Sequence, residues 1–439
     1  CMRAPSSMII AMIMSFYINA RLASVYLVAI LILGTCLFLI MRSAMKYFDQ
    51  AFPKYDELNA SVQENVSAIR VVKAYVREDH ETSKFHKAAE NIYKIFCKAE
   101  ENLSFNAPLM QLTVYSCILL ISWLGAKMIV GSSLTTGELM SLLTYCMNIL
   151  MSLMMLSMVF VMITMSLASA RRITEVLNEK SDLDNPENPD FDIPDGSITF
   201  DHVYFNYKKG AGEPVLSDIN LSIKSGETIG IIGGTGSAKT SLVNLISRLY
   251  DVTEGSIKVG GKDVRSYDME TLRNEVAVVL QKNVLFSGTI LDNLRWGDKN
   301  ASEEECKRVC RLACADEFID RMPEGYNTYI EQGGSNVSGG QKQRLCIARA
   351  LLKKPKVLIL DDSTSAVDTA TDAKIRKAFL TEIPETTKLI IAQRISSVQD
   401  ADRIIVMENG KVNGFGSHEE LLKTNEIYRE VYESQTGGG

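Results

Sequence analysis

The sequence has no excess of positive charge. Its 47 Lys and Arg residues are outnumbered by 53 Asp and Glu residues, which gives a net charge of −6. Binding to nucleic acid relies on a basic surface that neutralises phosphates. The charge balance therefore argues against a nucleic acid partner.

The sequence also lacks paired cysteines. Its nine cysteines show no spacing typical of a disulfide framework. Cys306, Cys310 and Cys314 recur every four residues, which predicts one face of a helix. Zinc sites usually combine a close cysteine pair with a second pair or with His. We therefore expect these three cysteines to be small buried side chains and not metal ligands.

Charge is missing from long stretches of the first half of the chain. The mean hydropathy of +0.03 is an average over an apolar first part and a remainder with the charge density of a soluble domain. The apolar runs predict four membrane-spanning helices, of which the first is short for a span. These spans are predicted at residues 4–18, 22–41, 109–130 and 139–168.

The connection between the second and third spans, 43–103, is rich in Lys and Arg, which places it on the cytoplasmic side. Its periodicity is helical, with Pro53 as the only breaker, so it predicts two helices that extend into the cytoplasm. In the last span, methionines recur on a narrow arc, which favours helix packing or a soft wall for apolar ligands. They are Met140, Met147, Met151, Met154, Met158, Met162 and Met165.

A glycine-rich loop follows a buried strand in the second half. The apolar run 227–232 leads into Gly233-Gly234-Thr235-Gly236-Ser237-Ala238-Lys239-Thr240, and an apolar helix comes next. This matches G-x-x-x-x-G-K-[ST] with one substitution, Ala238 for the last glycine. Such a loop directs backbone N–H groups at phosphates. We expect Lys239 to reach the outer phosphates of a nucleotide and the Thr240 hydroxyl to bind Mg²⁺.

A second motif lies downstream. Val337-Ser338-Gly339-Gly340-Gln341 opens a helix, and a buried strand, 357–360, ends at Asp361-Asp362. An acidic pair at the carboxyl end of such a strand is where α/β sheets place metal and nucleotide chemistry. The loop and this motif together resemble the ATPase domain of ABC transporters. The first half is similar to the membrane domain of their multidrug and lipid-flippase exporters.

The resemblance implies a fold of two parts: an all-α transmembrane domain at 1–178 and an α/β P-loop ATPase domain at 197–436, joined by the acidic, proline-containing linker 179–196. It implies six spans per subunit, so two would precede Cys1. It places the chain in a bacterial cytoplasmic membrane, in contact with membrane lipid, with its ATPase domain in the cytoplasm and with ATP and Mg²⁺ as cofactors. Drugs, lipids and peptides all use this architecture, which implies an amphipathic cargo.

Each site residue is assigned by the family position that it matches. Tyr207 would stack on adenine, Gly233 to Ser241 would hold the phosphates, and Thr240, Gln281 and Asp361 would ligate Mg²⁺. Ser338, Gly339, Gly340 and Gln341 would contact the ATP of a partner subunit, and Asp368, in the loop 365–368, would lie between subunits. The segment 73–79 would touch the partner's ATPase domain, and 331–334 lies where the family contacts such segments.

Three positions depart from the family pattern. Asp362 stands where the family has the Glu that polarises water, and Gln393 stands where it has a His facing the γ-phosphate. Ala238 replaces a glycine, and it is strained if its φ is positive. The signature Ser338–Gln341 is intact, except that Val337 precedes it where Leu is commonest. These features predict the half of a heterodimeric exporter whose own site hydrolyses ATP weakly. The alternatives are a homodimeric exporter with slow hydrolysis and a non-hydrolytic regulatory subunit.

Overall fold

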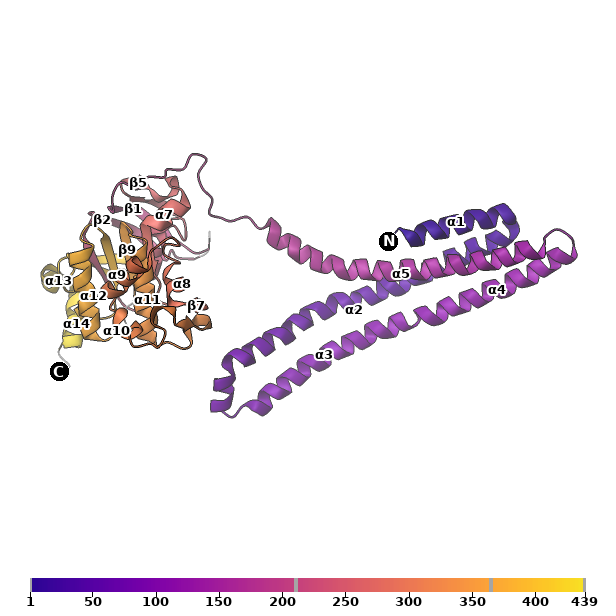
Figure 1. Ribbon diagram of the computed structural model, residues 1–439, viewed down its shortest axis with the longest axis horizontal. Coiled ribbons are helices and arrows are strands. Elements are labelled where there is room, and N and C mark those ends of the chain that lie inside the picture. Colours follow the sequence, from indigo (N-terminus) through magenta and orange to yellow (C-terminus); the bar gives the residue numbers. More distant parts are fainter. Residues whose placement is uncertain (1, 209–211, 363–365, 437–439) are drawn as a thin grey trace. The chain divides into compact units, whose positions relative to one another are not determined.

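The computed structural model describes residues 2–208, 212–362 and 366–436, without the side chains of 161, 164, 165 and 168. The chain divides into two compact units, Cys1–Lys180 and Ser181–Gly439 (Figure 1). The division falls at the start of the acidic, proline-containing stretch.

The first unit is helical. Its helices are α1 (Arg3–Ile18), α2 (Ala20–Ala74), α3 (Glu78–Ser104), α4 (Asn106–Val130) and α5 (Thr136–Asn178). Polar groups join them inside the apolar bundle: the Ser7 and Ser152 hydroxyls lie 2.7 Å apart, and the Tyr26 hydroxyl donates to the Leu142 carbonyl over 2.8 Å. Such bonds stabilise helix packing where water is absent.

Among the described residues, three stretches are long and apolar enough to cross a membrane, namely Ala20–Ala74, Glu78–Val130 and Thr136–Phe160. Helix α1 is apolar but has only 16 residues, fewer than the roughly 20 that a span needs. The predicted spans 22–41, 109–130 and 139–168 lie within long apolar helices, and the predicted short first span, 4–18, corresponds to the shorter helix α1. Asn19 separates α1 from α2, and its side chain caps α2.

Helices α2 and α3 extend well beyond their apolar parts, as the periodicity of 43–103 predicts. They run side by side (Figure 1). Lys84 on α3 donates a hydrogen bond to Glu64 on α2 over 2.9 Å. Helix α2 continues through Pro53, and its departure from helical dihedral angles is at Ala68, with φ −104° and ψ 16°. The tip between the two helices exposes Tyr75 and Val76, which are 76% and 81% accessible.

The second unit is built on a six-stranded sheet in the order β12-β11-β3-β10-β9-β6, parallel except for the β11–β12 pair. Strands β3, β9 and β10 are buried almost throughout, which explains their continuous apolar sequences. The strands are β3 (Thr228–Gly233), β6 (Val276–Val279), β9 (Val357–Asp361), β10 (Thr387–Ile391), β11 (Arg403–Glu408) and β12 (Lys411–Gly416).

An antiparallel sheet in the order β2-β1-β4-β5 packs on this layer through a shared apolar core. Its strands are β1 (Ile198–Phe205), β2 (Leu216–Ile223), β4 (Glu254–Val259) and β5 (Lys262–Asp263); β7 (Gly288–Thr289) pairs with β8 (Tyr329–Ile330). The alternation in 197–223 predicts the β1–β2 pair correctly. Residues 210 and 211 of the predicted turn lie outside the described residues.

Helices pack on the six-stranded sheet and on one another. They are α6 (Lys239–Ile246), α7 (Met269–Glu275), α8 (Ile290–Leu294), α9 (Glu303–Leu312), α10 (Asp316–Ile319), α11 (Gly339–Leu352), α12 (Thr369–Glu382), α13 (His418–Thr424) and α14 (Glu426–Thr436). Short 3₁₀ turns are η1 (Val264–Ser266), η2 (Gly325–Asn327), η3 (Gln332–Gly334) and η4 (Ile395–Ser397).

The three regularly spaced cysteines are buried, as predicted, but only two share a helix. Cys306 and Cys310 lie on α9, whereas Cys314 follows its end with φ +53°. Burial raises the pKa of the Cys310 thiol to about 12. A thiol that stays protonated is a poor zinc ligand, which supports a packing role.

Candidate nucleotide-binding site

The order of the central strands brings the predicted motifs to one edge. Strand β10 lies between β3 and β9, and Ile391 at its end is level with Ile231 on one side and Asp361 on the other. The carboxyl ends of these parallel strands therefore meet. They open on a pocket of about 410 Å³ lined by residues 232–240 together with Gln281, Asp361, Asp362, Ile391, Gln393 and Val431.

The glycine-rich loop forms one wall of this pocket. Lys239 begins α6, and its ammonium donates to the carbonyl oxygens of Gly233 and Gly234, both over 2.8 Å. Burial lowers the pKa of Lys239, while the charges of Asp361 and Asp362 act in the opposite direction. The cation thus lies across the loop, close to two carboxylates.

Asp361 and Thr240 form a bonded pair at the floor of the pocket. The Thr240 hydroxyl donates to Oδ2 of Asp361 over 2.9 Å. Burial raises the pKa of the Asp361 carboxyl, and the neighbouring charge of Asp362 raises it further. A positive charge placed here would offset both effects, because it favours the ionised carboxylate.

Asp362 and Gln393 touch each other. Gln393 Nε2 donates to Oδ2 of Asp362 over 2.8 Å, and the Asp362 N–H donates to the Ile391 carbonyl over 3.1 Å. Asp362 has φ +48°, an uncommon conformation that Asp tolerates better than most residues. Two of the three residues that depart from the family pattern are therefore in direct contact.

Tyr207 and Gln281 differ in their position relative to the pocket. Gln281 lines the pocket, whereas Tyr207 is tied to it through α6, because its hydroxyl lies 2.9 Å from that of Ser241. The Tyr207 ring is 51% exposed and packs edge-on against Phe205 and Tyr250. The Tyr207 side chain is therefore half exposed and held by its neighbours, and an accessible aromatic ring is what adenine stacking requires.

The lining of this pocket does not include the signature residues Ser338, Gly339, Gly340 and Gln341. Ser338 is the N-cap of α11: its hydroxyl accepts from the Gln341 N–H, and the Gln341 side chain accepts from the Ser338 N–H. This capping box fixes an exposed helix N-terminus, which favours anions. The motif therefore presents an exposed helix N-terminus outside the lining of this pocket.

The loop that contains Asp368 is anchored beside this cap. Ser365 lies outside the described residues, but the Ala366 N–H donates to Oε1 of the buried Gln343 on α11 over 3.0 Å. Asp368 caps α12 and accepts from the Thr371 N–H over 3.0 Å. Sequence patterns give no sign of the Gln343 contact, because Gln343 reads as an ordinary helix residue.

The pocket residues fit ATP with Mg²⁺. A Cβ at Gly234 would meet no protein atom within 4 Å, so packing does not require glycine there, whereas close approach of a phosphate does. The oxygens of Thr240, Gln281 and Asp361 are the hard ligands that Mg²⁺ prefers. Among the described residues no cluster of three or more His, Cys, Asp or Glu could hold a metal, so phosphate oxygens and waters would complete the shell.

Comparisons with known proteins agree with this geometry. Residues 216–365 match the model of the ABC transporter family, and residues 1–154 match that of the ABC transporter transmembrane region. YfiB, an ABC transporter ATP-binding protein of Bacillus subtilis, is 38% identical over 436 residues, covering 99% of this chain and 75% of YfiB. The chain belongs to the ABC transporter family.

A further relative and a solved structure resemble this chain over almost its whole length. An ATP-dependent lipid A-core flippase of Desulfotalea psychrophila is 37% identical, over 96% of this chain and 73% of the flippase. The solved structure of a bacterial Atm1-family ABC exporter with ATP bound superposes with a TM-score of 0.93 at 26% identity, over 99% of this chain and 77% of that one. This ABC transporter is an integral membrane half-transporter that exports its cargo at the expense of ATP.

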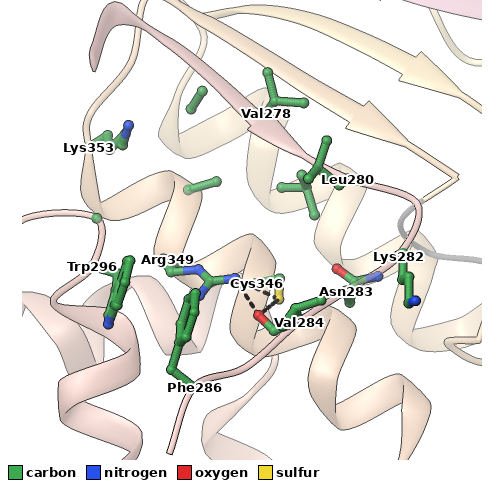
Figure 2. A pocket seen from close by; sticks show the side chains of 14 residues that line it. Val278, Leu280, Lys282, Asn283, Val284, Phe286, Trp296, Cys346, Arg349 and Lys353 are labelled. Carbon is green, nitrogen blue, oxygen red and sulfur yellow. Dashed lines mark hydrogen bonds between the residues drawn. The ribbon is translucent and has the colours of Figure 1, made fainter. Parts of the chain in front are cut away.

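The ATPase domain of this ABC transporter has a second hollow, of about 310 Å³ (Figure 2). Phe286 and Trp296 stack at its rim with ring centroids 4.0 Å apart. Next to these rings, Arg349 donates to the carbonyl oxygen of Val284 over 2.9 Å and lies 3.1 Å from the Cys346 sulfur. The hollow is an aromatic-rimmed groove with an ordered cation in its floor.

The strain anticipated at Ala238 is present, because this residue has φ +70° and ψ 23°. We expect Ala238→Gly to stabilise the ATPase domain by about 0.5–1 kcal/mol, since the left-handed conformation costs Ala about 1–2 kcal/mol and Gly loses part of that gain as chain entropy. Thermal unfolding of the two chains measures it. Ala238→Val should shift the midpoint downward, and a lower midpoint for Ala238→Gly would contradict the account.

Proposed function

We propose that this chain is one subunit of a heterodimeric exporter of amphipathic compounds, with a weakly hydrolysing ATP site of its own. The observation that carries the proposal is the contrast between two motifs. The capping box of Ser338 and Gln341 is complete, whereas the catalytic positions hold Asp362 and Gln393, bonded to each other. The signature motif is therefore suited to complete the ATP site of a partner subunit, whereas the chain's own ATP site is poorly suited to hydrolysis.

In this proposal each residue of the pocket has a defined role. Lys239 and the glycine-rich loop bind the phosphates, and Asp361, Thr240 and Gln281 hold Mg²⁺, while bound ATP supplies the phosphoryl group that water attacks. Asp362 is one methylene shorter than Glu, and its Oδ2 already accepts a hydrogen bond from Gln393. It is therefore poorly placed to take a proton from water. Gln393 donates hydrogen bonds but has no titratable nitrogen.

In this proposal each subunit's helical tip reaches the other subunit's ATPase domain. The tip of one subunit offers the exposed Tyr75 and Val76 between α2 and α3. The groove beneath Phe286 and Trp296 offers an aromatic rim and an apolar wall (Figure 2). A tyrosine in such a groove combines apolar burial with a hydrogen bond from its hydroxyl. ATP-driven closure of the ATPase domains would then move the tips and the helices they belong to.

The methionine face of α5 supports an amphipathic cargo. Its six described methionines are 45% to 75% exposed within the single chain, and they are Met140, Met147, Met151, Met154, Met158 and Met162. The side chain of Met165 lies outside the described residues. Flexible, polarisable thioethers adapt to varied apolar shapes. The face is therefore suited to line a transport path shared with the partner subunit.

The decisive experiment is steady-state ATP hydrolysis by the chain in lipid nanodiscs, alone and after co-expression with candidate partner subunits, with ATP binding followed in the same samples. The proposal expects tight binding with negligible turnover by the chain alone, and turnover once a partner with Glu and His at the matching positions is present. Brisk hydrolysis by the chain alone would identify a homodimer. Binding without turnover in every pairing would identify a regulatory subunit.

The proposed role of Ser338 can be tested without disturbing the helix cap. Asp is as good an N-cap as Ser, so Ser338→Asp keeps α11 intact but directs a negative charge at the phosphate facing it. We expect turnover of the heterodimer to fall at least about tenfold, since like-charge contact across an interface costs several kcal/mol. Affinity of this chain's own P-loop for ATP should not change. Equal turnover by Ser338→Asp and the unmodified chain would exclude the role.

A further inference from the structure

The C-terminal helix α14 holds the segment that follows β10. Gln435, on the last turn of α14, makes two hydrogen bonds to the main chain of this segment. Its Nε2 donates to the carbonyl oxygen of Gln393 over 2.9 Å, and its Oε1 accepts from the N–H of Ile395 over 2.8 Å. A single side-chain amide thus bridges the residues on either side of Arg394.

Helix α14 is itself fixed to the ATPase domain. Tyr428 is completely buried, and its hydroxyl lies 2.7 Å from Nδ1 of His418 on α13. Val431, four residues before Gln435, lines the nucleotide pocket. Residues four apart share one face of a helix, so Gln435 extends the face by which α14 meets the pocket.

A different helix holds the far end of the same segment. The Ser397 hydroxyl donates to Oδ2 of Asp372 over 3.3 Å, and Asp372 is a buried residue of α12. The segment 393–397 is therefore bonded to α12 at one end and to α14 at the other. The Gln393 side chain lies between the main chain of this segment and the pocket, and it donates a hydrogen bond to Asp362 over 2.8 Å.

The geometry points to Gln435 as a positioning residue: by bridging Gln393 and Ile395 it sets where the Gln393 side chain stands against Asp362 and the terminal phosphate of ATP. The inference rests on the proposed function, in which Gln393 faces that phosphate. Gln435 acts only through the main chain of Gln393, so it positions whichever side chain occupies that residue. The chain's last helix thereby takes part in the chemistry of the site without touching the nucleotide.

The bridge is tested first by hydrogen–deuterium exchange of the full chain in lipid nanodiscs. Gln435→Ala removes the acceptor of the Ile395 N–H, and exchange in the peptide 392–398 should speed up about 3- to 10-fold, the value of one net hydrogen bond. Gln435→Glu keeps an acceptor for Ile395 but has no donor for Gln393, so its increase should be smaller. Glu433→Gln, an exposed change on the same helix, is the control and should have no effect.

Kinetics then separates positioning from mere packing. The same substitutions are made in the unmodified chain and in one carrying Asp362→Glu and Gln393→His. We expect Gln435→Ala to lower kcat about 3- to 10-fold in the latter while the KM for ATP stays nearly constant, as befits a contact that matters in the transition state. Unchanged exchange overturns the inference, and so does faster exchange with unchanged kcat.

Failure of the proposed function gives a different result. In that case the chain with Asp362→Glu and Gln393→His hydrolyses ATP no faster than the unmodified chain, whether or not Gln435 is present. The role of Gln435 is read from the ratio of kcat values with and without its side chain, and from an exchange measurement that requires no turnover. The two failures are therefore distinguishable.

Discussion

Replacing Asp362 by Glu together with Gln393 by His is expected to raise the ATP turnover of this chain about a hundredfold, because a catalytic group misplaced by about 1 Å loses roughly that factor. The added methylene moves the carboxylate forward by about 1.5 Å. The second change removes the amide that donates to Asp362 over 2.8 Å and supplies a ring that takes up a proton. Both changes act on the same few atoms beside the terminal phosphate.

Because the two side chains touch, their effects should not add. Each single substitution changes only one of two contacting side chains. We therefore expect the increase in ATP turnover of the double variant to exceed the product of the increases of the two single variants. Steady-state hydrolysis by all four chains in nanodiscs measures the coupling. Gln399→His, the same change at an exposed position outside the nucleotide pocket, is the matched control.

The pH dependence offers an independent check on this prediction. Gln393 does not titrate, whereas a His at this position adds an ionisation near pH 6.5 to the profile of turnover. High turnover by the unmodified chain, with no gain from the double variant, would contradict the account of both residues.

Removal of the Lys239 ammonium is expected to abolish useful ATP binding. Each hydrogen bond from a charged donor contributes about 1.5–3 kcal/mol, so losing two phosphate contacts in Lys239→Ala should weaken the Kd by more than about a hundredfold. In the structure this ammonium donates to Gly233 and Gly234, both over 2.8 Å, at the loop that the phosphates would occupy. The same donors are in place to turn to the ligand.

Isothermal titration with ATP in the presence of Mg²⁺ measures the effect. Lys423→Ala on α13, outside the pocket lining, serves as the control for loss of one positive charge. Thermal unfolding of both variants shows whether the glycine-rich loop survives loss of the Lys239 contacts. Affinity for ATP within about threefold of the unmodified chain would contradict the assignment, since that difference is less than one hydrogen bond.

Local sequence determined the elements of this protein. Strands β3 and β9 are predicted as apolar runs because central parallel strands are buried on both faces. The long helices α2 and α5 follow from apolar length and periodicity, and the tight loop before Lys239 follows from its glycines. The sequence also marked Ala238 as strained if its φ is positive, and its φ is +70°.

Sequence reasoning was wrong about where one helix of the ATPase domain ends. Cys314 left the helical face on which its spacing placed it, because α9 ends at Leu312. The end of a helix depends on one or two capping residues, and hydrophobic periodicity does not predict them.

Only the tertiary structure decided which side chains of different elements are in contact. The sheet order sets β10 beside β9, so that Gln393 donates to Asp362, a residue distant in the sequence. In the same way α14 brings Gln435 to the main chain of Gln393. The sequence alone determined the helices, the strands and the phosphate-binding loop, because these depend on the preferences of adjacent residues. Contacts between elements depend on how whole layers pack, and no short pattern encodes them.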